Sequence, residues 1–352
     1  MANESVVPLA GEAGDPVPVP RRRLALRAGP IGLVLLVVIA GPCFVTLPWA
    51  VHRYNEQRLL GEQDLTRQPP SWSEPMGTDG FGRSLLWRCL MGGAISLGVG
   101  IAAAGIAVTI GVTWGALAGY IGGRVDALMM RIVDVLYGLP YILMVVLLDL
   151  ALSPVFDWLL RGVFGLWMEP GRASSVGRST ADVVTLLVAI GAVSWLTMAR
   201  VIRGQVLSLR EQPFIEAARA CGVGPGRILR VHLLPNLVGP MVVYTTLTVP
   251  QAILQESFLS FLGIGVQAPL PSWGNLAAEG VEQLSGLGLA GPAAERWALL
   301  REPIELLQRF GASVQAIEWW LVLFPCLLLG LTLMALNFLG DDLRARFDPK
   351  SG

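Results

Sequence analysis

The chain of 352 residues is 53% hydrophobic and only 15% charged, with 26 basic and 26 acidic residues and no net charge. An average globular protein carries about 25% charged residues, so this composition excludes most soluble proteins as well as extended disorder. The balanced charge gives no indication of nucleic-acid binding. Long apolar runs separate the charged clusters, and they predict an all-α integral membrane protein.

Six apolar runs indicate membrane-spanning helices, because about 20 helical residues cross the ~30 Å hydrocarbon core of a bilayer. We expect spans over residues 30–51, 96–120, 127–152, 183–199, 233–255 and 319–340. The first run follows four arginines, as a secretory signal would. It is too long for the apolar region of a signal, however, and no A-x-A cleavage site follows it. We therefore expect an uncleaved first span.

The distribution of basic residues predicts the orientation of these spans. Residues 1–29 and 341–352 are expected to be terminal tails, residues 52–90 an outer loop, and residues 91–340 the transport core with an inner loop at 200–232. The tails, that loop and the turn at 122–131 hold 15 of the 26 basic residues, at about twice the density of the outer segments. This bias favours cytoplasmic N- and C-termini.

The rarity of lysine excludes several activities. Lys350 is the single lysine, so neither a Walker A phosphate loop nor Schiff-base chemistry is available. The four cysteines are scattered without a CxxC pair, and His232 has no ligand at metal-binding spacing. Clustered catalytic groups are not evident either. We expect no cofactor, no metal site and no catalytic residue.

A ladder of glycines lies in the second predicted span. Gly111, Gly115 and Gly119 follow one another at intervals of four residues. Small residues at this spacing lie on one helix face and let two helix backbones approach closely in a membrane. We expect this face to pack against another span, with a solute-lining face as the alternative. Glu256, near the end of the fifth span, lies either at an outer helix end or on a solute path.

The inner loop at 200–232 predicts two short helices. Pro213 suits the first turn of one helix, and Glu216 near that turn is favourable for the helix dipole. Gly222 and Gly224 are expected to end it, and Pro225 to begin the second. Such a helix–turn–helix is either a docking element for a soluble partner or an interfacial helix that rests on the lipid headgroups. These physical arguments leave both alternatives open.

The spacing of residues in this loop resembles a known family. Glu216-Ala217-Ala218, three further residues, Gly222, nine residues, and then His232, Leu234 and Pro235 are similar to the EAA loop of bacterial ABC importer permeases. That pattern normally carries isoleucine at the position of His232, and histidine is usual there in the dipeptide, oligopeptide and nickel branch.

Four other segments resemble the C-type subunit of that branch. They are the GTDGFGR segment at 77–83, the glycine-rich turn at 119–131, the SFLG to PSWGN stretch at 260–275 and the C-terminal stretch at 337–349. Ser84 replaces the aspartate that ends the first motif in the family. The outer loops at 153–180 and 277–318 are longer than is usual.

The resemblance implies a type I importer permease with a six-helix bundle in the bacterial inner membrane. Such a subunit pairs with a second permease, two cytoplasmic ATP-binding subunits and an extracytoplasmic solute-binding protein, and it forms a path for peptides or related solutes. The resemblance assigns ATPase coupling to Glu216, Ala217, Ala218, Gly222, His232, Leu234 and Pro235. A proton-coupled secondary transporter is the alternative, although it would need an inverted repeat that the spans do not display.

Overall fold

The computed structural model describes residues 28–57, 66–165, 170–285 and 318–347. Within these ranges the chain is helical and has no strand, only two isolated β-bridges. The helices are α1 (Ala28–Val45), α2 (Leu47–Arg53), α3 (Leu85–Ile121), α4 (Gly123–Tyr137), α5 (Tyr141–Gly165), α6 (Pro170–Leu209), α7 (Pro213–Ala220), α8 (Pro225–Arg227), the π-helix η1 (Ile228–Leu233), α9 (Leu234–Asn236), α10 (Val238–Phe261), α11 (Trp273–Ser285) and α14 (Trp319–Phe347).

The lengths and compositions of the described helices confirm the all-α membrane fold. Four of the described helices are each long and apolar enough to cross a bilayer without a partner. They are those at 85–121, 141–163, 178–209 and 319–346. Two helix pairs meet the same test together, and each is bent by 60°: 29–45 with 47–53, and 225–236 with 238–261. If each bent pair is one span, six spans result.

The third predicted span differs from the structure. Residues 127–152 do not form one helix, because α4 ends at Tyr137 and α5 begins at Tyr141. Pro140 explains the break: its ring removes a backbone N–H donor and disfavours helical geometry at the residue before it. The apolar span is α5, which continues to Gly165. Much of the segment at 153–180, expected to be an outer loop, is therefore helical.

Three other predicted spans lie within longer helices, whereas those at 30–51 and 233–255 fall across the two bent pairs. The helix expected at 96–120 begins at Leu85, and the one expected at 183–199 is part of the 40-residue α6. The C-terminal helix continues beyond residue 340 to Phe347. Residues 1–27 of the expected N-terminal tail, residues 348–352 and most of the outer loop at 277–318 lie outside the described residues.

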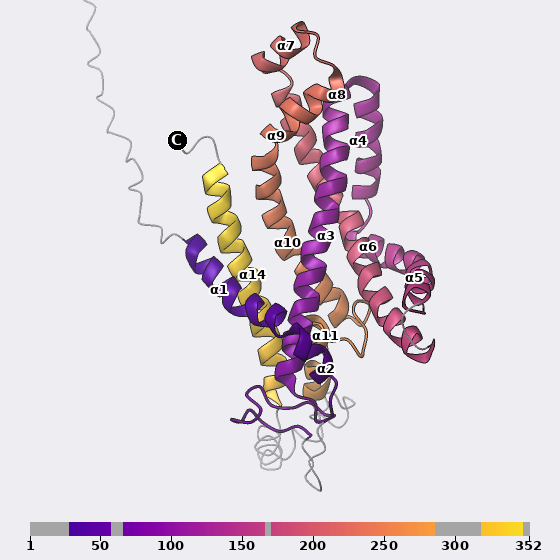
Figure 1. The fold of residues 1–352 in the computed structure, drawn as a ribbon, viewed down its shortest axis with the longest axis vertical. Helices are drawn as coiled ribbons and strands as arrows, with labels where there is room; N and C mark the ends of the chain where they lie inside the picture. The colour runs from indigo at the N-terminus through magenta and orange to yellow at the C-terminus, as the bar shows by residue number, and fades with distance from the viewer. Residues whose placement is uncertain (1–27, 58–65, 166–169, 286–317, 348–352) are drawn as a thin grey trace, which may run out of the picture.

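The spans form an elongated bundle in which α3 packs along α6, α5 along α6, and α1 along α14 (Figure 1). The short helix α7 lies at one end of the long axis, and α2 and α11 lie at the other. Two regions that the sequence singled out, the EAA-like loop and the segments around 77–83 and 260–275, are thereby separated by the length of the bundle.

The three ladder glycines lie against α6. A Cβ atom at Gly111 would lie 2.5 Å from Cβ of Met198, and one at Gly119 would lie 3.0 Å from the carbonyl oxygen of Arg203. A Cβ at Gly115 would overlap the backbone of Ala199. Only glycine permits this separation of the two helices, so the ladder brings α3 and α6 into backbone contact over two successive turns.

Candidate functional site

The helix α7 is anchored to the bundle through one apolar side chain. Ile215 is fully buried in a cluster that includes Val206 of α6 and Ile228 and Leu233 of η1. Pro213 opens the helix and Glu216 lies in its first turn. These features follow from the sequence, since proline and an acidic residue both suit a helix N-terminus.

The opposite side of α7 is exposed. Glu216, Ala217 and Ala220 are all exposed, whereas Ala218 is half-buried on the anchored side. The guanidinium of Arg219 lies 6.0 Å from the ring of Tyr120 at the end of α3. The exposed residues of α7 therefore combine the Glu216 carboxylate and two alanine methyl groups with Pro213, Phe214 (42% exposed) and Arg219, so the helix offers both charged and apolar contacts to a partner.

Gly222 fixes the turn after α7. Its φ of +75° is left-handed, its N–H donates to Arg219 O at 2.9 Å, and the N–H of Val223 donates to Ala218 O at 3.0 Å. This pair of hydrogen bonds is a Schellman motif, which ends a helix with glycine in the left-handed position. Gly224, with φ of −64°, instead precedes α8. The prediction that both glycines cap the helix therefore applies to Gly222 alone.

The second helix of the loop is irregular. It begins at Pro225 as expected, but it continues as a π-helix in which the N–H of Leu234 donates to Leu229 O. Pro235 accounts for the wider turn, because proline donates no hydrogen bond and its ring crowds the carbonyl four residues earlier. His232 and Leu234 are half-buried, and Pro235 is exposed. The loop returns to the bundle through the 60° bend before α10.

Ion pairs tie the helices beneath this loop together. Arg203 of α6 donates two hydrogen bonds to the Asp126 carboxylate of α4, from Nε at 2.5 Å and from Nη2 at 2.6 Å. This bidentate contact lowers the pKa of the Asp126 carboxyl below its usual value. Arg210 donates to the Gly119 carbonyl at 3.1 Å. The ends of α3, α4 and α6 thus form one fixed base for α7.

A cavity of about 400 Å³ opens between the end of α4, the start of α5, α6 and α10. The hydroxyl of Tyr141 donates to Oε1 of Gln255 and lies 3.4 Å from the Ser194 hydroxyl. Thr248 and Gln251 present further polar groups from α10. None of the described residues that line the cavity is charged. It is an uncharged pocket, lined by both polar and apolar side chains, within the membrane-spanning part of the bundle.

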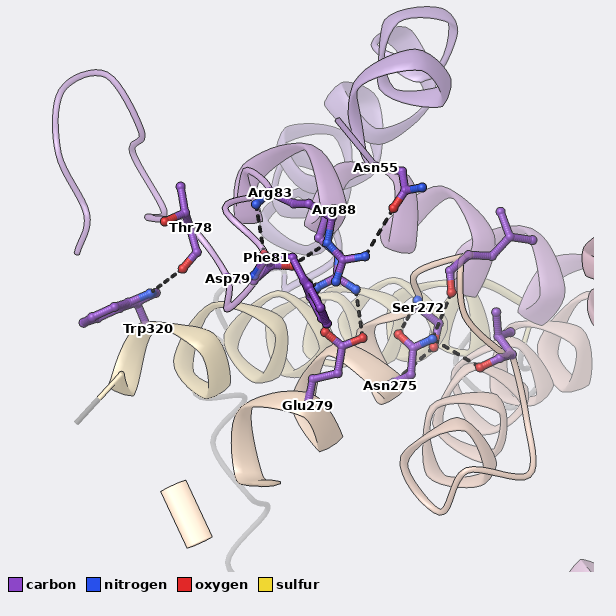
Figure 2. A network of polar contacts seen from close by, with 12 residues as sticks. Asn55, Thr78, Asp79, Phe81, Arg83, Arg88, Ser272, Asn275, Glu279 and Trp320 are labelled. Atoms are coloured by element: carbon purple, nitrogen blue, oxygen red, sulfur yellow. Dashed lines mark hydrogen bonds and ion pairs between the residues drawn. The ribbon is translucent and has the colours of Figure 1, made fainter. Parts of the chain in front are cut away.

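A buried ionic network lies at the opposite end of the bundle (Figure 2). Arg88 of α3 donates to both carboxylate oxygens of Glu279 of α11, at 2.6 and 2.8 Å, and to Asp79 at 2.8 Å. Asp79 also accepts hydrogen bonds from the backbone N–H groups of Phe81 and Arg83, each at 2.9 Å. Asp79 therefore closes the turn of the GTDGFGR segment and holds that turn on α3.

The same end of the bundle contacts α14. The indole of Trp320 donates to Thr78 O at 3.4 Å, and Gly280 of α11 lies against Leu321.

In the part of the chain that the structure describes, no three His, Cys, Asp or Glu side chains gather where they could hold a metal ion.

Comparison with known proteins identifies the family. The model of the binding-protein-dependent transport system inner membrane component family matches residues 111–351. The oligopeptide transport system permease protein OppC of Haemophilus influenzae is 39% identical over 78% of this chain and 70% of its own length. The dipeptide transport system permease protein DppC of Bacillus subtilis is 39% identical over 94% and 83% of the two chains, and OppC of that organism is 32% identical over 97% and 96%.

The chain belongs to this family. It is a permease subunit of an ABC importer and a multi-pass protein of the bacterial inner membrane. The relatives give no support to a proton-coupled carrier.

The permease carries functional candidates that sequence reasoning did not find. The lining of the cavity gives no pattern in the sequence, since it combines uncharged residues from several helices that no motif relates. Arg88 and Glu279 are 191 positions apart, and each reads as a charge beside an apolar run. A signal was available for the pair, because both residues flank motifs of the family, the GTDGFGR segment and the PSWGN stretch.

Proposed function

We propose that this permease carries peptides or related solutes into the cell after an extracytoplasmic binding protein delivers them. The solute class is supported by the relatives, which are named for oligopeptide and dipeptide transport. In this proposal the permease forms a heterodimer with a second permease subunit, and two cytoplasmic ATP-binding subunits supply the energy. The chain itself hydrolyses nothing, and both of its termini lie in the cytoplasm together with α7.

The observation that carries the proposal is the exposed face of α7. A short helix that stands on one buried anchor, Ile215, and presents Glu216, Ala217 and Ala220 outward is suited to a groove on a soluble partner. The family pattern assigns that role to the ATP-binding subunit. The Asp126–Arg203 and Arg210–Gly119 contacts would transmit a push on α7 to α4, α6 and α3, because they join the bases of those helices.

The neutral cavity is our candidate for this subunit's part of the solute path. A peptide backbone offers N–H and C=O groups, and the lining offers hydroxyl and amide groups that can pair with either. A lining without charge would accept peptides of different side-chain charge, since no fixed ion would repel any of them. The same hydroxyl and amide groups could also bind another uncharged polar solute, but they match a peptide backbone more closely.

Reconstitution tests this function. The complete importer, co-purified with its second permease and ATP-binding subunits, is placed in proteoliposomes with binding protein and a labelled peptide. We expect import that requires both ATP and binding protein. Import driven by a proton gradient without ATP would exclude the proposal.

A matched pair of variants tests the docking face of α7. Ala217→Trp adds a large side chain to the exposed face and should abolish co-purification of the ATP-binding subunits, whereas Ala217→Ser keeps the small size and should retain it. If Ala217→Trp retains the ATP-binding subunits and transports normally, α7 does not dock on those subunits. The alternative, an interfacial helix that rests on the lipid headgroups, would then be favoured.

A further inference from the structure

Glu256 lies in α10 at the point where this helix, α3 and the segment 262–275 meet. The side chain is fully buried, so it is neither at an exposed helix end nor among the residues that line the cavity. Among the described residues, no ion pair involves it. A buried carboxylate without a cation is costly unless several donors satisfy its oxygens.

Four serine hydroxyls satisfy this carboxylate. Ser260 donates to Oε1 at 2.8 Å and Ser257 donates to Oε2 at 3.1 Å. Ser96 of α3 and Ser272, which precedes α11, also lie against it. A carboxylate only accepts hydrogen bonds and offers about four lone-pair positions. The serine hydroxyls therefore supply partners to both oxygens of Glu256, and an amide in its place would present N–H donors at one of these two positions.

Three of the four serines also hold the backbone of the neighbouring segment. The hydroxyl of Ser260 accepts the N–H of Val266 at 2.9 Å, that of Ser96 accepts the N–H of Trp273 at 3.3 Å, and that of Ser272 accepts the N–H of Asn275 at 3.3 Å. Each hydroxyl thus links one backbone N–H to the Glu256 carboxyl group, most directly at Ser260, which donates to it at 2.8 Å. Ser257 differs, since within the described residues its hydroxyl hydrogen-bonds to the carboxylate and to no backbone group.

The first turn of α11 fits closely into this place. Gly274 lies so near the backbone of Ser257 that a Cβ atom there would overlap it. Trp273 is fully buried, and its indole donates to Cys89 O at 3.1 Å. From this anchored turn α11 extends to Glu279, which receives the Arg88 fork (Figure 2). The direction of α11 is therefore set at two points, the serine cluster and the ionic network.

We propose that Glu256 is a positioning residue: through three serines it fixes the segment 262–275 and α11 on α3 and α10, and so orients the end of the permease that the binding protein engages. Its side chain meets no solute. The engagement by the binding protein rests on the proposed function, whereas the anchoring of the segment does not.

Three variants in the complete reconstituted importer test this inference. Glu256→Gln keeps the shape of the side chain but replaces one hydrogen-bond-accepting oxygen by an amide donor. Ser96→Ala keeps the carboxylate but removes the hydroxyl that lies between it and the backbone N–H of Trp273. Ser257→Ala is the matched control, because it removes a donor to Glu256 that holds no backbone group. Hydrogen exchange of the peptide that covers 262–276 reports the anchoring directly, and the concentration of binding protein that half-saturates ATPase stimulation reports the orientation.

We expect exchange of this peptide to be faster by about fivefold or more in Glu256→Gln and Ser96→Ala, as the loss of one or more buried hydrogen bonds implies, and unchanged in Ser257→Ala. The half-saturating concentration should rise in the first two variants while basal ATPase activity stays constant. Unchanged exchange in both would overturn the inference. If Glu256→Gln does not assemble, Ser96→Ala decides alone. If the binding protein does not stimulate the ATPase activity of the wild-type importer, the proposed function is contradicted. In that case the hydrogen-exchange measurement alone decides whether Glu256 anchors the segment.

Discussion

Arg88 and Glu279 form a bidentate fork. The two terminal nitrogens of the Arg88 guanidinium in α3 each donate a hydrogen bond to one oxygen of the Glu279 carboxylate in α11. Arg88 is 3% exposed and also contacts Asp79, so one side chain joins α3, α11 and the GTDGFGR turn. Bidentate geometry of this kind is specific to arginine, because a lysine ammonium acts as a point charge. The fork is therefore sensitive to a substitution that preserves charge.

Arg88→Lys should destabilise the permease by about 1–3 kcal/mol, the usual value of a hydrogen bond to a charged group. The reason is that one ammonium cannot serve Asp79 and both oxygens of Glu279. Thermal unfolding of the purified complex in detergent measures the effect. Arg161→Lys is the control, since its partner Asp157 lies one turn away on the same half-exposed helix face, and such pairs contribute little. Equal melting temperatures for the two variants would argue against the fork.

The glycines that follow α7 should differ in their tolerance of alanine. Gly222→Ala places a Cβ at φ of +75°, which costs about 1–2 kcal/mol, whereas Gly224 has an ordinary φ of −64°. No heavy atom lies within 4 Å of a Cβ at either position, so conformation alone separates them. We expect Gly222→Ala to reduce retention of the ATP-binding subunits and Gly224→Ala to leave it unchanged. Pull-down on a tagged permease checks both, and equal retention would remove the role assigned to this turn.

The Asp126–Arg203 pair predicts a specific pH dependence. A free aspartate has a pKa near 3.9, and the pKa of Asp126 in the folded protein is lower. The stability that the pair contributes is therefore complete above about pH 5 and disappears as the pH falls through the folded pKa. The difference in melting temperature between wild type and Asp126→Asn should be equal at pH 8 and pH 5, and it should shrink below about pH 4. A difference that already shrinks between pH 8 and pH 6 would show that another group is responsible.

Removal of neutral polar groups from the cavity should weaken import without affecting assembly. Thr248→Val and Gln251→Leu keep the approximate size of each side chain and delete its hydrogen-bonding groups. We expect the half-saturating peptide concentration to rise by about 2- to 10-fold, as the loss of a neutral hydrogen bond implies. Acidic, basic and neutral peptides should be affected alike if their backbones are the contact. Leu247→Met, at another lining position, is the control, and wild-type import in all three variants would exclude the cavity from the solute path.

Local chemistry explains which parts of the structure the sequence predicted. The all-α membrane fold follows from composition, and the left-handed Gly222 follows from a helix that must end before Pro225. The break before Tyr141 was missed because the apolar pattern continues through Gly138–Pro140, although the proline was a usable signal. The sequence does not reveal which of two nearby glycines closes the turn, so it predicts a helix end at both Gly222 and Gly224.

Contacts between distant segments could not be predicted in the same way. The serines around Glu256 are spread from α3 to the segment before α11, and nothing in their spacing indicates a common partner. The cavity likewise depends on how α5, α6 and α10 are arranged. Such sites result from tertiary packing, whereas caps and turns are specified within a few residues.

The contact of the ladder glycines with α6 constrains how the permease can move. Because Gly111, Gly115 and Gly119 let α3 approach the backbone of α6 closely, sliding of one helix along the other would bring atoms into overlap, and we expect the two helices to move together. The movement that exposes the solute path to alternate sides then has to take place at joints elsewhere. Candidate joints in the described chain include the interruption between α4 and α5, the 60° bend between α1 and α2, and the 60° bend that leads into α10.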